Sequence, residues 1–309
     1  MNKIYDDMTA LIGMTPIVRL SRLEEKLGIG AELYAKLEYL NPTGSIKDRA
    51  ALAMIRAAED AGTLTEGGTV IEPTSGNTGI GIAAIAAVRG YRAVIVMPEG
   101  MSEERTKLMR AYGATVIYSP REGGMQGAVD MANELCKSTP GAVVLSQFTN
   151  AANRAAHLES TAPEIYRAMG ENIDILVAGV GTGGTLMGLA EGLSEHCPSL
   201  YVVAVEPERS PLLSEGHAGA HGIAGIGANF VPPLFDGELV DEIVTVSDED
   251  AMRLVRECGI AEGIGIGISS GAALAAAARV ARRFENEDKK IVVILPDGID
   301  RYLSVEGLW

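Results

Sequence analysis

Basic residues, cysteines and aromatic residues are all scarce in this 309-residue sequence. Only 26 lysines and arginines stand against 41 aspartates and glutamates, so the formal net charge is -15. Proteins that bind a phosphate backbone need clustered lysine and arginine, and we therefore expect no nucleic-acid partner. The three cysteines are widely spaced and odd in number, which excludes a disulfide framework and a cysteine metal motif. We expect them to be buried, reduced thiols.

A signal peptide and a long apolar run are also absent. Residues 1–11 contain acidic residues instead of a basic region, and no stretch of roughly 18 apolar residues occurs elsewhere. We therefore predict no membrane segment and, by default, a cytoplasmic protein. Only His217 and His221 are close together among the histidines, and no cysteine lies near them, so no metal site is predicted. The single tryptophan, Trp309, is expected to dock as an apolar anchor at the end of the chain.

Short β-rich runs alternate with helical patterns from about Thr69 onward, in the order typical of parallel βαβ units. The strands are expected at residues 69–72, 93–97, 115–118, 142–147, 173–178, 201–206 and 290–295. The helices are expected to start near Asn77, Ser102, Gly124, Ala151, Gly184, Ser247 and Ser270. With 47% hydrophobic residues available for a core, this pattern predicts a three-layer α/β fold.

One lysine needs an explanation of its own. Residues 41–49 read Asn-Pro-Thr-Gly-Ser-Ile-Lys-Asp-Arg, in which Ser45 is a good N-cap and Lys47 opens an apolar, buried helix. The positive end of the helix dipole disfavours the ammonium form of a lysine in the first turn, which makes its amine nucleophilic. Such amines form Schiff bases with aldehydes, and pyridoxal 5'-phosphate (PLP) is the commonest aldehyde cofactor of this kind. Alternatively, Lys47 reaches solvent or pairs with Asp48.

Residues 72–79, Glu-Pro-Thr-Ser-Gly-Asn-Thr-Gly, join an expected strand to an expected helix. Open α/β sheets bind ligands at this carboxyl end of a strand. The N–H groups of the helix start, with Thr74, Ser75 and Thr78 beside them, suit a carboxylate, while Asn77 could hydrogen-bond a ring oxygen. A helix cap with a turn is the alternative, but a cap needs one such residue and here four occupy five positions.

A second anion cradle is expected at residues 179–185, Gly-Val-Gly-Thr-Gly-Gly-Thr, which follow an expected strand and open another helix. A phosphate fits there, and the absence of a P-loop lysine argues against a nucleoside triphosphate. The segment also matches G-x-G-x-x-G, with Glu206 about 20 residues on, where a ribose-binding acid belongs in a dinucleotide-binding unit. That alternative, an NAD-dependent dehydrogenase, leaves Lys47 and the Asn77 loop without a role.

Residues 267–271, Gly-Ile-Ser-Ser-Gly, lead from a short apolar segment into an alanine-rich helix. Ser269 would point its hydroxyl into a site at the strand end, and Ser270 would serve as the N-cap. A serine facing a pyridine nitrogen is a neutral partner and would not hold the ring protonated as an aspartate would. This arrangement suits elimination better than transamination.

Taken together, these segments resemble the cysteine synthase (O-acetylserine sulfhydrylase) family of fold type II PLP enzymes, over nearly the whole length. The resembling segments are residues 41–49, 72–79, 101–114, 147–148, 163–165, 181–185, 225–228 and 267–271. The resemblance implies two three-layer αβα domains with mostly parallel sheets and PLP in the cleft between them. Residues 1–150 would carry the lysine and the substrate-carboxylate loop, with roughly 12–38 crossing into the other sheet. Residues 151–309 would carry the phosphate and pyridine sites.

The resemblance also implies a role for each site residue. Lys47 would form the internal aldimine and later act as the base on the substrate α-carbon. Asn77 would hydrogen-bond the 3′ oxygen of the cofactor, and Ser269 would lie at its pyridine nitrogen. The residues implied for the cofactor phosphate are Gly181, Thr182, Gly183, Gly184 and Thr185. Those implied for the substrate α-carboxylate are Thr74, Ser75, Gly76, Thr78 and Gln147.

The implied reaction is a ping-pong β-replacement that converts O-acetyl-L-serine and sulfide to L-cysteine and acetate through an external aldimine and an aminoacrylate. Closure of the smaller domain is expected, because the aminoacrylate must be kept from water. A homodimer is implied, and serine acetyltransferase is left open as a partner.

Three departures from the family pattern leave the substrates open. Arg154 ends the run Asn-Ala-Ala-Asn-Arg, in which both prolines of the family's Asn-Pro-Ala-Asn-Pro are lost. Asn229 stands where glycine is usual. The run Leu-Pro-Asp-Gly at residues 295–298 replaces the common Pro-Ser, and its Asp297 resembles the cystathionine β-synthases. A cystathionine β-synthase-like enzyme, or a β-replacement enzyme that uses serine or O-phosphoserine, is therefore the nearest alternative.

Overall fold

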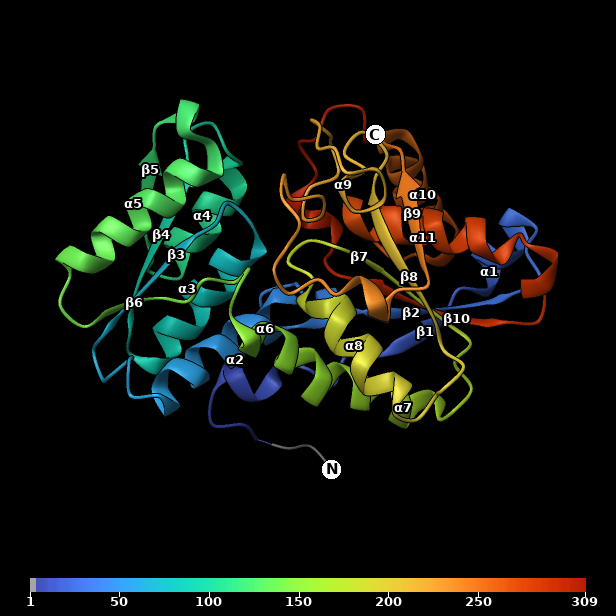
Figure 1. The fold of residues 1–309 in the computed structure, drawn as a ribbon, viewed down its shortest axis with the longest axis horizontal. Coiled ribbons are helices and arrows are strands. Elements are labelled where there is room, and N and C mark those ends of the chain that lie inside the picture. The colour runs from blue at the N-terminus through green and yellow to red at the C-terminus, as the bar shows by residue number, and fades with distance from the viewer. Residues whose placement is uncertain (1–3) are drawn as a thin grey trace. The chain divides into compact units, whose positions relative to one another are not determined.

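The computed structural model describes residues 4–309, and the chain divides into two compact units (Figure 1). Unit 1 comprises Met1–Ile12 and Asn41–Asn153, and unit 2 comprises Gly13–Leu40 and Arg154–Trp309. Each unit contains one sheet, with four strands in unit 1 and six in unit 2. The predicted α/β class with mostly parallel sheets in αβα layers is confirmed.

The sheet of unit 1 is wholly parallel and has the order β5-β4-β3-β6. Its strands are β3 (Thr69–Pro73), β4 (Arg92–Pro98), β5 (Thr115–Ser119) and β6 (Ala142–Val144). Its helices are α2 (Lys47–Asp60), α3 (Asn77–Arg89), α4 (Glu103–Ala111) and α5 (Gly124–Ser138), and α6 (Ala151–Ala156) follows β6.

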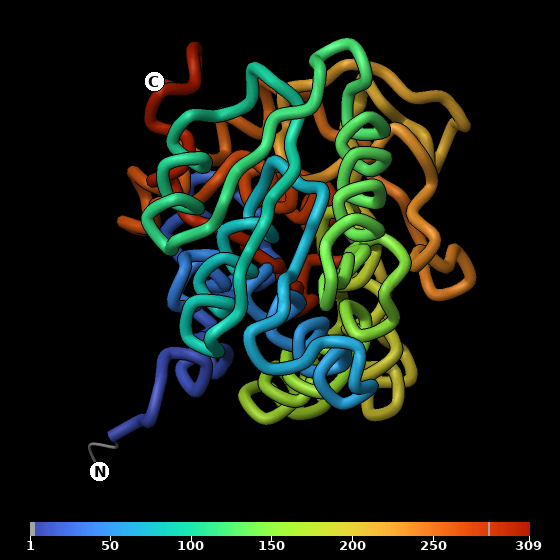
Figure 2. Tube along the Cα trace, turned by 90° about the vertical axis from the view of Figure 1, so that its left-hand side faces the viewer, coloured from blue at the N-terminus to red at the C-terminus, as the bar shows by residue number. Residues whose placement is uncertain are grey.

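Alternating side chains of these strands enter two different cores. Val70 and Ile95 pack with α2, α3 and α4, whereas Ile71 and Val96 pack with Ala128 of α5 and its neighbours. Figure 2 shows α4 (teal) and α5 (green) on opposite sides of the strands. Both faces of the sheet are therefore covered, which explains why β3 and β4 read as nearly continuous apolar runs.

The sheet of unit 2 has the order β1-β2-β10-β7-β8-β9 and is parallel except for the β1–β2 pair. Its strands are β1 (Ile17–Arg19), β2 (Glu32–Leu37), β7 (Ile175–Gly179), β8 (Tyr201–Pro207), β9 (Glu242–Val246) and β10 (Lys290–Leu295). Its helices are α1 (Ser21–Leu27), α7 (Ala162–Met169), α8 (Gly184–Ser194), α9 (Leu212–Glu215), α10 (Asp248–Glu262) and α11 (Ile268–Ala281). Side chains of α1, α10 and α11 share one core with the strands.

All seven strands expected from the sequence are present, but the strand expected at 142–147 ends at Val144. Beyond it Ser146 takes a left-handed conformation with φ 58, which no strand can continue. Strands β1, β2 and β9 are additional to the seven.

Two of the expected helix caps are confirmed and two need correction. The hydroxyls of Ser102 and Ser247 accept hydrogen bonds from backbone N–H groups in the first turns of α4 and α10. The N-cap of α11 is Gly267, so Ser270 lies inside the helix, and the N-cap position of α2 is Ile46 instead of Ser45.

The expected role of the carboxyl-terminal tryptophan is wrong. Trp309 is 59% exposed, whereas its neighbour Leu308 is fully buried and acts as the anchor. All three cysteines are free; Cys197 and Cys258 are buried and Cys136 is partly buried. Burial raises the pKa of the Cys258 thiol to about 12, which makes it unreactive. Within residues 4–309, no helix combines the length and the apolar character needed to span a membrane.

Candidate active site

Lys47 is the first residue of α2 and is partly buried, as the sequence predicted. The Ser45 hydroxyl oxygen accepts a hydrogen bond from the Lys47 backbone N–H at 3.2 Å. Asp48 stabilises the turn before α2, because its buried carboxylate accepts hydrogen bonds from both the N–H and the hydroxyl of Thr43. The Asp48 carboxylate therefore fixes the backbone from which Lys47 projects.

The segment Thr74–Thr78 comprises the connection from β3 to α3 and the first two residues of α3, with Gly76 as the N-cap of the helix. The Gly76 N–H donates to the Thr74 hydroxyl at 3.2 Å, which closes a tight turn. Thr74 and Thr78 are 4% and 3% exposed, and Ser75 and Asn77 are partly buried. Because α3 has 13 residues, its unpaired N–H groups and dipole favour an anion at this end.

Gln147 joins this loop from a segment far along the chain. The Thr78 hydroxyl donates to the Gln147 side-chain carbonyl oxygen at 2.6 Å. The Gln147 backbone N–H donates to Glu72 at 3.0 Å, and the Asn153 side chain donates to the Gln147 backbone carbonyl at 2.8 Å. The structure thus brings Gln147 to the Thr74–Thr78 loop within unit 1.

Glu72 is a residue to which the sequence analysis gave no role. It is fully buried, and this burial raises the pKa of its carboxyl to about 7. Its oxygens accept hydrogen bonds from the backbone N–H groups of Ser146 and Gln147. The available signal was an acid inside the apolar run Thr-Val-Ile-Glu-Pro.

The glycine-rich segment of unit 2 lies between β7 and α8, and its geometry requires its glycines. Gly183 is the N-cap of α8 and has φ 85, which disfavours any side chain. A Cβ atom at Gly181 would overlap the backbone carbonyl oxygen of Gly225. The N–H groups at the start of this 11-residue helix, which have no partner within the helix, form a cradle for an anion.

Two threonines complete the cradle. The Thr182 hydroxyl accepts from the Gly184 N–H at 3.4 Å, and the Thr185 hydroxyl lies 3.2 Å from Nε2 of His157. Nδ1 of His157 in turn lies 3.0 Å from the Thr161 hydroxyl, so the buried imidazole orients Thr185. His157 is a second residue whose role was missed, because its partners are set only by the fold.

Ser269 lies in the first turn of α11 and is 4% exposed. A Cβ atom at Gly225 would lie 3.7 Å from the Ser269 hydroxyl oxygen. Because the same Gly225 also packs against Gly181, the backbone of Gly225 links the glycine-rich cradle to Ser269. Unit 2 therefore brings together two motifs that the sequence separates widely.

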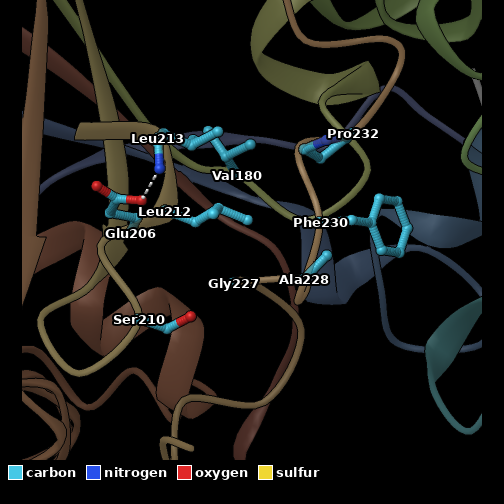
Figure 3. A pocket seen from close by; sticks show the side chains of 9 residues that line it. All are labelled: Val180, Glu206, Ser210, Leu212, Leu213, Gly227, Ala228, Phe230 and Pro232. Atoms are coloured by element: carbon cyan, nitrogen blue, oxygen red, sulfur yellow. Dashed lines mark hydrogen bonds between the residues drawn. The ribbon is translucent and has the colours of Figure 1, made fainter. Parts of the chain in front are cut away.

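Glu206, the ribose-binding acid of the dinucleotide alternative, is engaged in other hydrogen bonds. The carboxylate of Glu206 accepts hydrogen bonds from Leu213 N–H at 2.8 Å, from Ser214 N–H at 3.0 Å and from the Ser214 hydroxyl at 2.5 Å. Figure 3 shows this carboxylate turned toward Leu213 at the edge of a pocket. Glu206 is 1% exposed, so it holds the start of α9 and cannot receive a ribose without breaking these bonds.

The three departures from the family pattern have different surroundings. Arg154 forms an ion pair with Glu191 of α8 at 2.8 Å, and Asn229 is exposed. Asp297 is 1% exposed and accepts a hydrogen bond from the Tyr302 hydroxyl at 2.6 Å. Its backbone carbonyl accepts from Gly267 N–H at 3.0 Å, so Asp297 supports the start of α11 that carries Ser269.

The chain is similar to known proteins in sequence and in structure. Residues 8–297 match the family described as pyridoxal-phosphate dependent enzyme. Cysteine synthase B of Campylobacter jejuni is 46% identical over 98% of this chain and 99% of its own length, and a probable cysteine synthase of Bacillus subtilis is 47% identical over 100% and 99%. The crystal structure of cysteine synthase from Entamoeba histolytica superposes with a TM-score of 0.95 at 42% identity, covering 99% of this chain and 91% of that one.

Proposed function

The chain belongs to the family of pyridoxal-phosphate-dependent enzymes, and on that premise we propose that it converts O-acetyl-L-serine and sulfide to L-cysteine and acetate. The observation that carries the proposal is the identity of 46% and 47% with two cysteine synthases over essentially the full length of all three chains. The buried Ser269 hydroxyl agrees with it, because a neutral partner for a pyridine nitrogen favours elimination and replacement over transamination.

The residues of unit 2 fit the phosphate of PLP. The cradle is lined by backbone N–H groups and threonine hydroxyls, and a Cβ at Gly181 would disturb it by meeting the backbone of Gly225. We propose that Gly181, Thr182, Gly183, Gly184 and Thr185 hold the cofactor phosphate, with Ser269 at the pyridine nitrogen. PLP, when bound, supplies an aldehyde for Lys47 and an electron sink for the pair released at the substrate α-carbon.

In unit 1 we propose that Lys47 binds the cofactor and Asn77 hydrogen-bonds its 3′ oxygen. The Lys47 amine would remove the α-proton of the substrate, after which acetate leaves the β-carbon with its bonding electron pair. Sulfide then adds to the β-carbon, and Lys47 returns the proton to the α-carbon.

The substrate α-carboxylate would be held at the amino-terminal end of α3 by Thr74, Ser75, Gly76, Thr78 and Gln147. Gln147 is 6% exposed, and Thr74 and Thr78 are buried as well, so the carboxylate would exchange water for fixed donors. Anchoring the carboxylate fixes the direction of the Cα–H bond relative to the base, which is what proton removal by a positioned lysine requires.

An absorbance titration tests the proposal. The purified protein should show a visible band from bound PLP that changes when O-acetylserine is added and returns when sulfide follows, with one cysteine and one acetate formed per cycle. The Lys47→Ala variant should lose both the band and turnover. A response to serine in place of O-acetylserine would assign the cystathionine β-synthase-like alternative, and a protein without any PLP-dependent band would overturn the proposal.

The remaining proposals concern location and assembly. We propose a cytoplasmic homodimer, which light scattering of the purified holoenzyme would detect as about 65 kDa, twice the chain mass. Serine acetyltransferase is proposed as a protein partner because the resemblance implies it. A peptide with the carboxyl-terminal sequence of that enzyme should then inhibit competitively with O-acetylserine, and no inhibition would remove the partner.

A further inference from the structure

Three hydrogen bonds fix Gln147, and in one of them its backbone N–H donates to a buried acid. Its backbone N–H is held by Glu72, its backbone carbonyl by Asn153, and its side-chain carbonyl by Thr78. The Thr78 hydroxyl donates to the side-chain oxygen of Gln147, which leaves the side-chain NH2 group as the end that donates to a ligand. An NH2 donor suits a carboxylate, whereas the opposite orientation would repel one.

The backbone that presents Gln147 adopts a conformation that needs support. Ser146 has φ 58, a left-handed conformation that costs a residue other than glycine roughly 1 kcal/mol. This conformation directs the N–H groups of Ser146 and Gln147 to the two oxygens of Glu72, at 2.8 and 3.0 Å. Without an acceptor for both, the buried N–H of Gln147 and the partly buried N–H of Ser146 would lose their partner, and Ser146 would return to an extended conformation.

We propose that Glu72 is a positioning residue for the amino-acid substrate: its carboxylate holds the turn at Ser146 so that Gln147 faces the substrate carboxylate. The inference rests on the proposed function, because Gln147 is assigned to that carboxylate there. Glu72 itself does not touch substrate or cofactor. It is the last residue but one of the central strand β3 and acts only through the backbone of the segment that follows β6.

The ionisation of Glu72 should make its effect on Gln147 depend on pH. Burial raises its pKa to about 7, and the groups that lower it are the backbone N–H groups of Gln147, Ser146 and Leu145. Its neighbour across the sheet, Ile95 of β4, is apolar, and no charged side chain among the described residues acts on this carboxyl. The carboxylate form, which accepts from both N–H groups, therefore predominates above about pH 7, and the protonated form predominates below.

The test compares Glu72→Gln with the wild-type holoenzyme. Glutamine keeps the shape but replaces one acceptor by a donor, so the KM for O-acetylserine should rise by about ten-fold or more at pH 8, the loss expected for a charged hydrogen bond. The ratio of variant to wild-type KM should approach one as the pH falls below 7. Taking the ratio cancels the titration of the substrate itself.

Two further variants isolate the backbone effect. Ser146→Gly should restore much of the KM of Glu72→Gln, because glycine adopts the left-handed conformation without support. Glu24→Gln is the matched control: Glu24 is also buried and accepts from a backbone N–H, that of Leu33 at 2.7 Å, but it belongs to unit 2, and its partners Leu33 and Arg19 are not site residues. It should leave the KM and its pH dependence unchanged.

A measurement without turnover completes the test. In the wild-type holoenzyme, the amide proton shifts of Ser146 and Gln147 should titrate with a midpoint near 7, and this titration should vanish in Glu72→Gln. If Gln147→Ala raises the KM but Glu72→Gln does not, or if Ser146→Gly gives no rescue, the inference is wrong while the proposed function stands. If Gln147→Ala itself leaves the KM unchanged, the assignment of the carboxylate site fails, and the inference with it.

Discussion

Gly181 provides the sharpest test of the phosphate cradle, through Gly181→Ala. The added Cβ would lie under 3.0 Å from the Gly225 carbonyl oxygen, a distance that real Cβ atoms do not adopt. The obstacle is backbone, so relief requires a shift of the cradle or of the segment that reaches Ser269. Overpacking of this kind costs about 1–3 kcal/mol. In the holoprotein this cost weakens phosphate binding, because the shift displaces the groups that donate to the phosphate.

The dissociation constant of PLP should therefore rise about 10- to 100-fold in Gly181→Ala. The assay removes PLP, restores it in steps and follows its absorbance, while denaturant unfolding of the apoprotein verifies that the variant folds. Gly259→Ala in α10 is the control, because its Cβ would meet nothing within 4 Å. A Gly181→Ala protein that folds and binds PLP within about two-fold of wild type would refute the cradle, since 1 kcal/mol already corresponds to more than that.

Three other variants test the remaining features. Thr78→Val should raise the KM for O-acetylserine about five- to ten-fold by releasing the Gln147 side chain, whereas Thr106→Val, equally buried in α4, should not. Glu206→Gln should lower the free energy of unfolding by about 1–3 kcal/mol and leave PLP binding intact, which calorimetry and absorbance would check. For Glu72, whose pKa rises from 4.5 to about 7 on folding, the folded state binds the extra proton between these values. Denaturant unfolding of wild type against Glu72→Gln should therefore show a wild-type stability contribution that is fully present below pH 4.5 and falls by about 3 kcal/mol by pH 8; a pH-independent difference would contradict the buried carboxyl.

The sequence predicted the most buried strands together with the partly exposed β5 and β6, and it missed β1, β2 and β9. β3, β8 and β10 are buried runs that any parallel sheet of this kind requires. β2 was missed because it contains Lys36, which is 1% exposed. Its ammonium is satisfied by the Thr15 carbonyl and by Glu164, 128 residues away, and no local pattern reveals such partners.

For the site as well, features with local sequence signals could be predicted and features that depend on distant partners could not. Loops at strand ends, such as Thr74–Thr78, could be read directly because turn residues, hydroxyls and helix starts are local signals. The residues that support these loops could not be predicted, because Glu72 accepts hydrogen bonds from Ser146 and Gln147, which are 74 and 75 residues away in the sequence. The same holds for His157, which meets Thr185 across 28 residues.

The two units build their anion sites by different means, and the difference matches what each site is proposed to hold. In unit 2 the donors are backbone N–H groups fixed by glycines that pack against other backbone, as at Gly181 and Gly225, so they cannot turn away. Such a cradle suits a phosphate that stays through every cycle. In unit 1 the donors include the side chain of Gln147, whose orientation depends on the Thr78 hydroxyl and on one buried carboxylate. A binding site that protonation of Glu72 weakens suits a carboxylate that must be released after every turnover.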